Sequence, residues 1–180
     1  MKSTPTLLSA FGFLGVIGLS SQVALAGGHA AAATAELKNI EGAIIGAADL
    51  TQSPHGLLVH IKVNDLPRGP KAVHFHSKAH CAEQTGFKSS HGHHGEGKGE
   101  HGLLNAAGPG MGDLGNIYVG ENGVGEMQFF KTGVFLDSGD LPLMDEDGTA
   151  IVIHAEADDQ VTQPIGGAGA RIVCGLLQAS

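Results

Sequence analysis

The sequence predicts an all-β domain, an antiparallel sandwich or barrel of short strands. Runs of alternating apolar and polar residues recur, turn signals separate them at spacings of about ten residues, and no helical period persists beyond one or two turns. The clearest run is residues 57–63, where four apolar residues alternate with more polar ones: Leu57, Val59, Ile61 and Val63.

The other strands are expected where shorter runs of the same kind lie between turns. Residues 53–56 form a hairpin signal before the first run, residues 64–69 form a longer turn after it, and residues 121–123 (Glu-Asn-Gly) form another hairpin signal. Between these turns we expect strands at residues 43–50, 72–77, 116–119, 125–130, 149–154 and 172–177.

Two long segments interrupt this pattern, residues 78–113 and residues 155–170. Loops longer than about 15 residues in a compact domain are usually functional or disordered. Each of these segments begins just after a histidine, His76 in one case and His154 in the other. We therefore expect the two loops to form the walls of a functional site.

The N-terminus has the pattern of a secretory signal. Lys2 precedes an apolar stretch at residues 7–19, and Ala-Leu-Ala at residues 24–26 is a small-x-small cleavage site. The stretch is shorter than the about 20 residues of a membrane span, and an uncleaved anchor is the alternative. We expect a periplasmic or secreted protein in three parts: a cleaved signal at residues 1–26, a loose segment at 27–34 and one domain at 35–180.

Charge and cysteine content narrow the function classes. With 10 basic and 18 acidic residues the net charge is −8 at pH 7, which argues against nucleic acid or an anionic membrane as partner. An anionic substrate would need a local positive field. The two cysteines, Cys81 and Cys174, indicate one disulfide in an oxidising compartment, and two buried free thiols are the alternative.

The histidines point to a metal. His74 and His76 lie two residues apart in an expected strand, so both side chains leave the same face about 6.6 Å apart. Such a pair can share one metal ion, although two polar positions on a solvated strand face would give the same pattern. More histidines follow in the first long loop and at the end of an apolar strand, which together predict a transition-metal site: His91, His93, His94, His101 and His154.

The order of these motifs resembles the copper–zinc superoxide dismutases, and best the bacterial exported branch, over residues 35–177. The resemblance is carried by Val-His-Phe-His at residues 73–76, Cys81, His101-Gly102, Gly-Asp-Leu-Gly-Asn at 112–116, His154 through Asp158-Asp159, and Gly-Ala-Arg at 169–171 before Cys174-Gly175. It implies an eight-stranded Greek-key β-barrel, an immunoglobulin-like sandwich with two long functional loops, and an antioxidant enzyme that converts superoxide to dioxygen and hydrogen peroxide.

The resemblance also implies a ligand set for copper. Copper would bind His74, His76, His154 and a histidine shared with zinc. The family spacing to His101 and to the zinc aspartate gives His93 as the shared residue. The stretch after it differs from the family pattern, so His91 or His94 could take that place after a small shift.

The zinc side departs from the family. The implied ligands are His93, His101 and Asp113, but the position of the fourth, three residues before the aspartate, is Gly110. Structural zinc takes four protein ligands, so this site has an open position and loss of tight zinc is favoured. Water could fill the gap, or one of several neighbours could: His80, His91, His94, Glu96 or Glu100.

The remaining roles follow from the same resemblance. Arg171 would attract superoxide, with an ion pair to a loop aspartate as the alternative, and His93 would deliver a proton. A Cys81–Cys174 disulfide would hold the arginine in place.

Asp158 would accept N–H bonds from His74 and His101 and so link the two metal sides, with a solvated loop acid as the alternative. Four histidines are assigned to the surface: His29, His55, His60 and His80. A non-catalytic periplasmic copper- or zinc-binding protein on the same barrel is the second functional hypothesis. Monomer and homodimer are both open.

Overall fold

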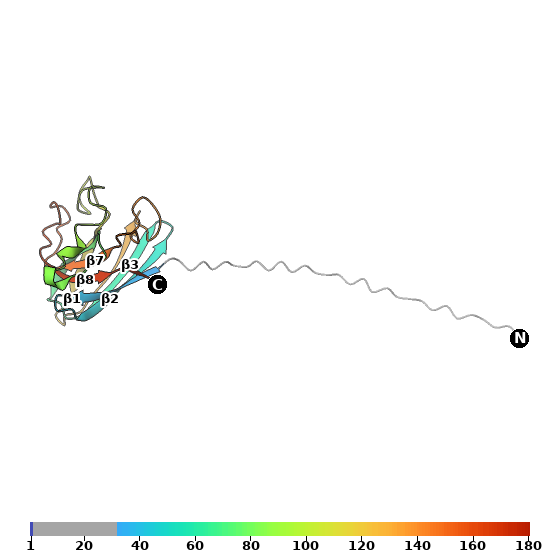
Figure 1. The fold of residues 1–180 in the computed structure, drawn as a ribbon, viewed down its shortest axis with the longest axis horizontal. Helices are drawn as coiled ribbons and strands as arrows, with labels where there is room; N and C mark the ends of the chain where they lie inside the picture. The colour runs from blue at the N-terminus through green and yellow to red at the C-terminus, as the bar shows by residue number, and fades with distance from the viewer. Residues whose placement is uncertain (2–31) are drawn as a thin grey trace.

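A computed structural model describes residue 1 and residues 32–180. Nine strands form one antiparallel sheet, and hydrogen bonds between β1 and β2 close eight of them into a barrel (Figure 1). The strands are β1 (Ala32–Asn39), β2 (Ile44–Ser53), β3 (Gly56–Val63), β4 (Gly69–His76), β5 (Asp113–Val119), β6 (Gly125–Thr132), β7 (Ala150–His154), β8 (Arg171–Leu176) and β9 (Gln178–Ala179).

The strand order is that of a Greek-key barrel. Neighbours run β2-β3-β6-β5-β4-β7-β8-β1, so the chain crosses from β3 past β6 and β5 before it returns to β4. The only helical elements within residues 32–180 are two single 3₁₀ turns, η1 (Glu83–Thr85) and η2 (Lys88–Ser90). Among the described residues, no helix combines the length and apolar character needed to cross a bilayer. The predicted fold class is confirmed.

Two strands were not predicted, the two-residue β9 at the C-terminus and the longer β1. β1 begins at Ala32, inside the segment 27–34 that was expected to be loose. Ala33, Ala35 and Leu37 alternate inward in this strand and are buried. Alanine contributes so little to an apolar pattern that the alternation is hard to see in the sequence. The expected signal at residues 1–26 and residues 27–31 of the loose segment fall outside the described residues, apart from Met1.

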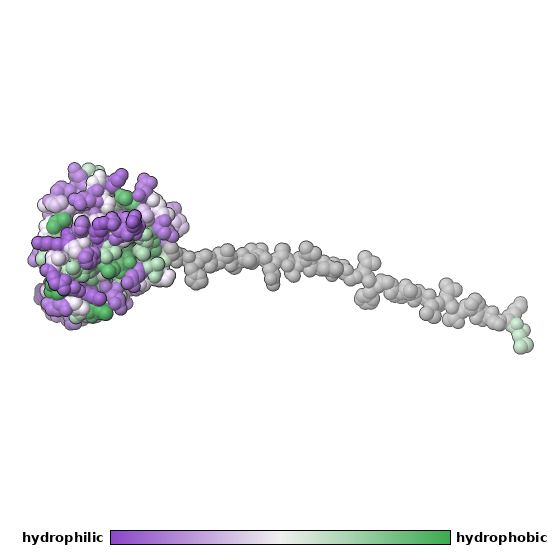
Figure 2. Space-filling model, viewed as in Figure 1, coloured by the Kyte–Doolittle hydropathy of each residue, from purple (hydrophilic) through white to green (hydrophobic). Residues whose placement is uncertain are grey.

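The barrel interior is a single hydrophobic cluster to which all eight barrel strands contribute. In β4 and β7 the core-facing residues include Val73, Phe75, Ile151 and Ile153. Polar residues cover most of the face seen in Figure 2, and hydrophobic residues form smaller patches between them. The barrel is thus a rigid support whose inside is filled by side chains.

A second, smaller cluster lies on the outer side of β7 and β8. Phe87, from the first long loop, packs there with Val152 and with the Cys81–Cys174 disulfide, whose Cα atoms are 5.7 Å apart. The predicted disulfide is confirmed. β7 is therefore buried on both faces, by the core on one side and by the loop on the other.

Candidate metal centre

The centre lies on the outer face of the barrel, under the first long loop. In β4, Val73 and Phe75 point into the core, so alternation directs His74 and His76 to the opposite face. Both histidines are buried, because residues 77–112 fold back over them. The period-two argument from the sequence thus gives the correct face.

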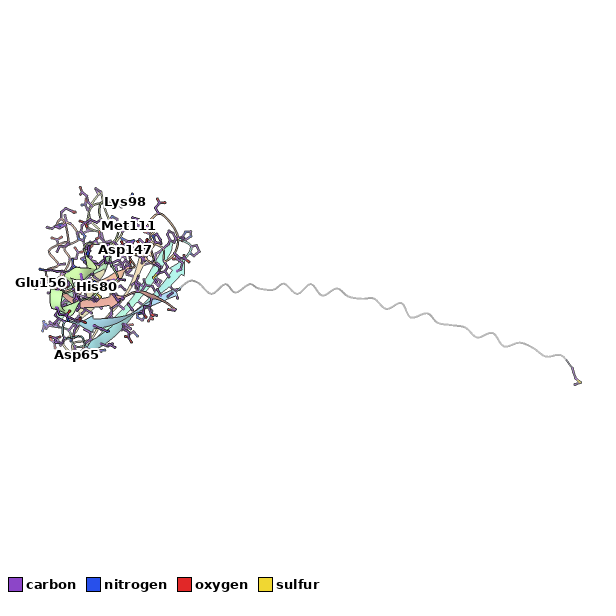
Figure 3. The ribbon with its side chains drawn as sticks, viewed as in Figure 1. Asp65, His80, Lys98, Met111, Asp147 and Glu156 are labelled. Carbon is purple, nitrogen blue, oxygen red and sulfur yellow. A yellow bond between two sulfur atoms is a disulfide. The ribbon has the colours of Figure 1, made fainter. Side chains whose placement is uncertain are left out.

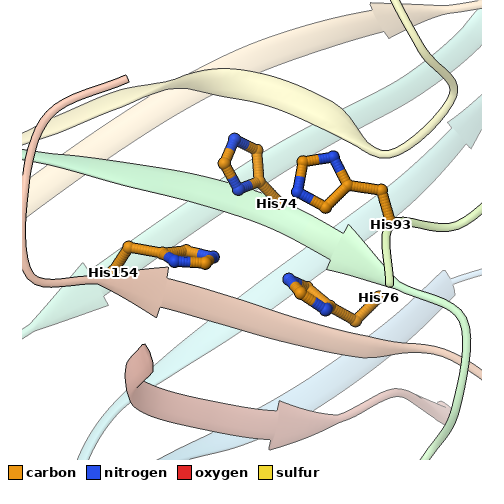
Figure 4. Close-up of side chains that lie close together, drawn as sticks. All are labelled: His74, His76, His93 and His154. Atoms are coloured by element: carbon orange, nitrogen blue, oxygen red, sulfur yellow. The ribbon is translucent and has the colours of Figure 1, made fainter. Parts of the chain in front are cut away.

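The neighbouring strand and the loop add two more rings. β7 pairs with β4 in the register His74–Val152 and His76–Ala150, which brings His154 to the end of the same outer face. His93 comes from the loop and forms an isolated β-bridge with His76. One ring nitrogen from each of His74, His76, His93 and His154 lies within 4.8 Å of the others, and Figure 4 shows the four rings turned toward one space.

Each of the four rings has one nitrogen held and one free. His76 and His154 donate from Nδ1 to the carbonyls of His91 and Gly169, at 2.8 and 3.2 Å. His74 donates from Nε2 to Asp158, and His93 donates from Nδ1 to Asp113. The opposite nitrogens, Nδ1 of His74 and Nε2 of the other three, are buried without a hydrogen-bond partner.

Such unpaired buried nitrogens are rare in folded proteins, and a metal ion accounts for them. Burial lowers the pKa of His74 to about 4 and that of His154 to about 3, and it also lowers the pKa of His76. These three rings are therefore neutral at pH 7, as metal binding requires. Imidazole ligands suit copper, so the donor set fits the metal implied by the resemblance.

A second cluster shares two rings with the first. His74, His93, His101 and Asp113 also bring their ligand atoms within 4.8 Å. Asp113 Oδ1 accepts a hydrogen bond from Nδ1 of His93 at 3.2 Å and lies 2.7 Å from Nδ1 of His101, and Oδ2 accepts from the backbone N–H of Gly102 at 2.8 Å. Burial tends to raise the pKa of Asp113, but these donors outweigh it and hold the pKa well below its usual value.

His74 belongs to the implied copper set, so three donors of this cluster are left for zinc, and Gly110, at the position of the fourth, has no side chain. The Gly110 N–H donates to Asp113 Oδ2 at 2.8 Å, and a β-carbon at Gly110 would lie 3.2 Å from the same oxygen. A histidine at this position would thus sit beside the aspartate. The described residues supply three of the four ligands that structural zinc takes, two histidines and a carboxylate.

The residues considered as replacements lie elsewhere or are engaged. His94 is buried, but its ring contacts the Leu141 carbonyl at 3.2 Å and Thr149 Oγ1 at 3.4 Å. His91 is exposed. His93 alone of the three loop histidines belongs to both clusters. His80, Glu96 and Glu100 are exposed side chains.

Asp158 connects the clusters from the second long loop. Its Oδ2 accepts from Nε2 of His74 at 2.7 Å, and its Oδ1 accepts from Nε2 of His101 at 3.0 Å and from the Gln160 N–H at 2.6 Å. Burial tends to raise the pKa of this carboxyl, but the three donors lower it overall. Gly166 is needed here, because it has φ +61° and a β-carbon would overlap Asp158.

Arg171 lies at the mouth of the centre. An open cleft of about 1040 Å³ is lined by both long loops and reaches His76, His93, His154 and Arg171, as expected of the site walls. The Arg171 Nη1 donates to the Phe87 carbonyl at 2.9 Å and to Ser90 Oγ at 3.1 Å, not to an aspartate. The disulfide loop thereby fixes the guanidinium.

Sequence reasoning missed two residues near the site. Ser90 is fully buried and receives the Arg171 hydrogen bond. Lys131 is buried in β6 and donates to the Gly110 carbonyl at 2.7 Å. The expected strand at 125–130 ends two residues too early, because β6 continues to Thr132. Extending its alternation to residue 131 would have placed this lysine inside.

The histidines assigned to the surface behave as expected where the structure describes them. His55 and His80 are exposed, and His60 is half-buried and contacts Glu126 at 2.7 Å. His29 falls outside the described residues. None of the three described histidines belongs to either cluster.

Comparisons of the sequence and of the structure with known proteins point to the same family. The sequence model of one family, copper/zinc superoxide dismutase (SODC), matches residues 44–177. The chain is 42% identical to "Superoxide dismutase [Cu-Zn]" of Caulobacter vibrioides over 149 residues, 81% of this chain and 85% of the relative. It is 40% identical to "Superoxide dismutase [Cu-Zn] 2" of Aquifex aeolicus, covering 81% and 86%. The crystal structure of a SOD-like protein from Bacillus subtilis superposes with TM-score 0.75 at 36% identity, covering 81% and 97%.

Proposed function

The chain belongs to the copper/zinc superoxide dismutase family and converts superoxide to dioxygen and hydrogen peroxide, and from this premise we propose that His74, His76, His93 and His154 hold its copper. The observation that supports this assignment is the convergence of four buried ring nitrogens that lack a hydrogen-bond partner. Each ring is oriented by a hydrogen bond from its other nitrogen, and burial keeps His74, His76 and His154 neutral at pH 7, as copper binding requires.

Bound copper supplies the one-electron chemistry, in which one superoxide is oxidised and a second is reduced. The protein has to attract the anion, position it and provide protons. Arg171 attracts and orients superoxide, since its guanidinium keeps its charge at working pH although burial lowers its pKa. This local charge is needed because the chain as a whole is acidic.

His93 is the proposed proton donor. Its Nε2 lies in the copper cluster and faces the cleft, while Asp113 holds its Nδ1. Because one nitrogen cannot bind copper and carry a proton at the same time, Nε2 would hold this proton only while it does not bind copper, and the proton would then lie where the reduced substrate is formed. Transfer from this atom would contribute to formation of hydrogen peroxide, and solvent in the cleft would supply the second proton.

The zinc side is proposed to be weak. His93, His101 and Asp113 are its donors, and Gly110 removes the fourth. Asp158 is proposed to orient His74 for copper through the same network.

We also propose that residues 1–26 act as a cleaved signal, that residues 35–180 act as the catalytic domain, and that the mature enzyme is periplasmic or secreted. A disulfide within the domain supports an oxidising compartment. N-terminal sequencing of protein from the cell envelope should begin at Gly27. Sedimentation of that protein distinguishes a monomer from a homodimer.

The ligand assignment is tested with His154→Ala, using His80→Ala as the matched control at an exposed histidine. The enzyme and both variants are loaded with copper, and bound copper and superoxide consumption are measured. We expect His154→Ala to lose tight copper and activity and His80→Ala to keep both. Full copper and activity in His154→Ala would contradict the assignment. An unaltered protein with full copper but no turnover would instead favour the non-catalytic metal-binding role.

A further inference from the structure

Lys131 is a buried basic residue near the end of β6, and it has no role in the proposed mechanism. Alternation in β6 directs Met127, Phe129 and Lys131 to the inner side, and Lys131 is only 5% exposed. A lysine is almost never buried to this degree unless a partner compensates for its charge. Within residues 32–180, no carboxylate lies within 4.0 Å of its ammonium group.

The contact that Lys131 does make leads to the zinc side. Its Nζ donates to the Gly110 carbonyl at 2.7 Å, and the N–H of the same Gly110 donates to Asp113 Oδ2 at 2.8 Å. Asp113 in turn contacts the Nδ1 atoms of His93 and His101. One residue of backbone therefore separates the ammonium from the carboxylate that would bind zinc.

Lys131 adds positive charge to a carboxylate that already has N–H donors. Asp113 is buried, and its oxygens contact the ring nitrogens of His93 and His101 and accept from the backbone N–H groups of Gly102 and Gly110. Zinc would supply that charge in a four-ligand site. Burial lowers the pKa of Lys131 to about 8, and Asp113 acts against this shift, so the ammonium is still largely protonated at pH 7.

We propose that Lys131 selects against zinc: its ammonium replaces the charge of the ion beside Asp113 and repels a divalent cation from the three remaining donors. Two features of this chain thus act together, since Gly110 removes a ligand and Lys131 supplies a fixed positive charge at the same place. The result is an enzyme that binds copper and excludes zinc. The inference rests on the proposed function, because it takes His93, His101 and Asp113 as the zinc donors.

The experiment measures zinc binding to the copper-loaded full domain by competition with a chromophoric chelator. The test variants are Lys131→Met and Lys131→Gln, and Gln keeps a donor for the Gly110 carbonyl without the charge. Lys98→Met is the control, since Lys98 is an exposed lysine far out in the loop that covers the site (Figure 3). Gly110→His restores the missing ligand.

We expect the unaltered protein to bind zinc weakly, and both Lys131 variants to bind it about tenfold more tightly or better, because a fixed charge near a divalent ion costs several RT even at a high effective dielectric. Lys98→Met should leave zinc affinity unchanged. Gly110→His combined with Lys131→Gln should bind one zinc per chain, more tightly than Gly110→His alone.

The proposal is overturned if Lys131→Gln binds zinc within twofold of Lys98→Met, or if the unaltered protein already holds one tightly bound zinc per chain. If Lys131→Met fails to fold, the Gln variant decides the question. Copper affinity is measured on the same samples. Loss of copper from the unaltered protein would refute the proposed ligand set, whereas normal copper with unchanged zinc would refute only the role of Lys131.

Discussion

Replacing Asp158 by asparagine should weaken copper binding although Asp158 touches no copper. The carboxylate is fully buried and accepts three N–H bonds, two at Oδ1 and one at Oδ2. Asparagine has one acceptor oxygen. The best arrangement keeps that oxygen at Oδ1, where His101 and Gln160 donate, and places the NH₂ group where His74 now donates from Nε2.

The Nε2–H of His74 would then face the NH₂ group of the asparagine, so two hydrogen-bond donors would point at each other. The ring can avoid this by moving its proton from Nε2 to Nδ1, but Nδ1 is the nitrogen that lies free in the copper cluster. Copper would have to displace that proton or bind a misoriented ring. Loss of such an outer acceptor weakens metal binding about 10- to 100-fold, or about 1.4–2.7 kcal/mol.

The assay is a copper competition against a chelator at pH 7, with Asp159→Asn as control. Asp159 is the adjacent residue but exposed, and its carboxylate contacts only its own loop through Val161 and Thr162. We expect Asp158→Asn to weaken copper at least tenfold and Asp159→Asn to have little effect. Equal copper affinity in the two variants would refute the argument that His74 is held by Asp158.

Three further predictions concern the arginine and the buried histidines. Arg171→Ala should keep copper but lose about tenfold or more in rate, measured by pulse radiolysis at low salt, where unchanged turnover would contradict its role. Ser90→Ala removes one of the two acceptors to which Arg171 Nη1 donates. Its rate should fall only about two- to fivefold and should depend less on ionic strength than that of the unaltered enzyme. The metal-free protein should lose stability as pH falls below about 6.5, down to about 4 for His74 and about 3 for His154, because both histidines bind protons more readily when unfolded; each contributes up to about 1.4 kcal/mol per pH unit. A flat free energy of unfolding in urea between pH 6.5 and pH 5 would show that these rings are not buried as neutral groups.

The sequence was most informative where one strand face is polar and the other apolar. In β4, period-two alternation alone places His74 and His76 together on the face opposite Phe75, and the structure has them there. The flanking turns gave most strand boundaries to within a few residues. These features depend on local backbone geometry, which a single sequence expresses directly.

Features that depend on contacts between distant segments were harder to predict. Spacing could not exclude His91 or His94, and only the folded loop shows that His93 alone belongs to both clusters. β1 was not predicted because two of its buried positions, Ala33 and Ala35, are alanines. Lys131 lies beyond the expected strand at 125–130, and the sequence gives no sign of its contact with the Gly110 carbonyl, which comes from a distant loop.

The hydrogen bonds of Asp113 and Asp158 to the copper histidines explain how copper binding can persist when the zinc side is altered. In a complete two-metal site zinc would help to hold His93, but here Asp113 accepts from its Nδ1 and Asp158 accepts from His74. Both carboxylates keep pKa values below their usual range, so they remain charged acceptors at any physiological pH. Each copper histidine is thus oriented by the protein itself, through a carboxylate or a backbone carbonyl. Loss of the zinc ligand at Gly110 therefore removes an ion without removing the hydrogen bonds that direct the free nitrogens toward copper.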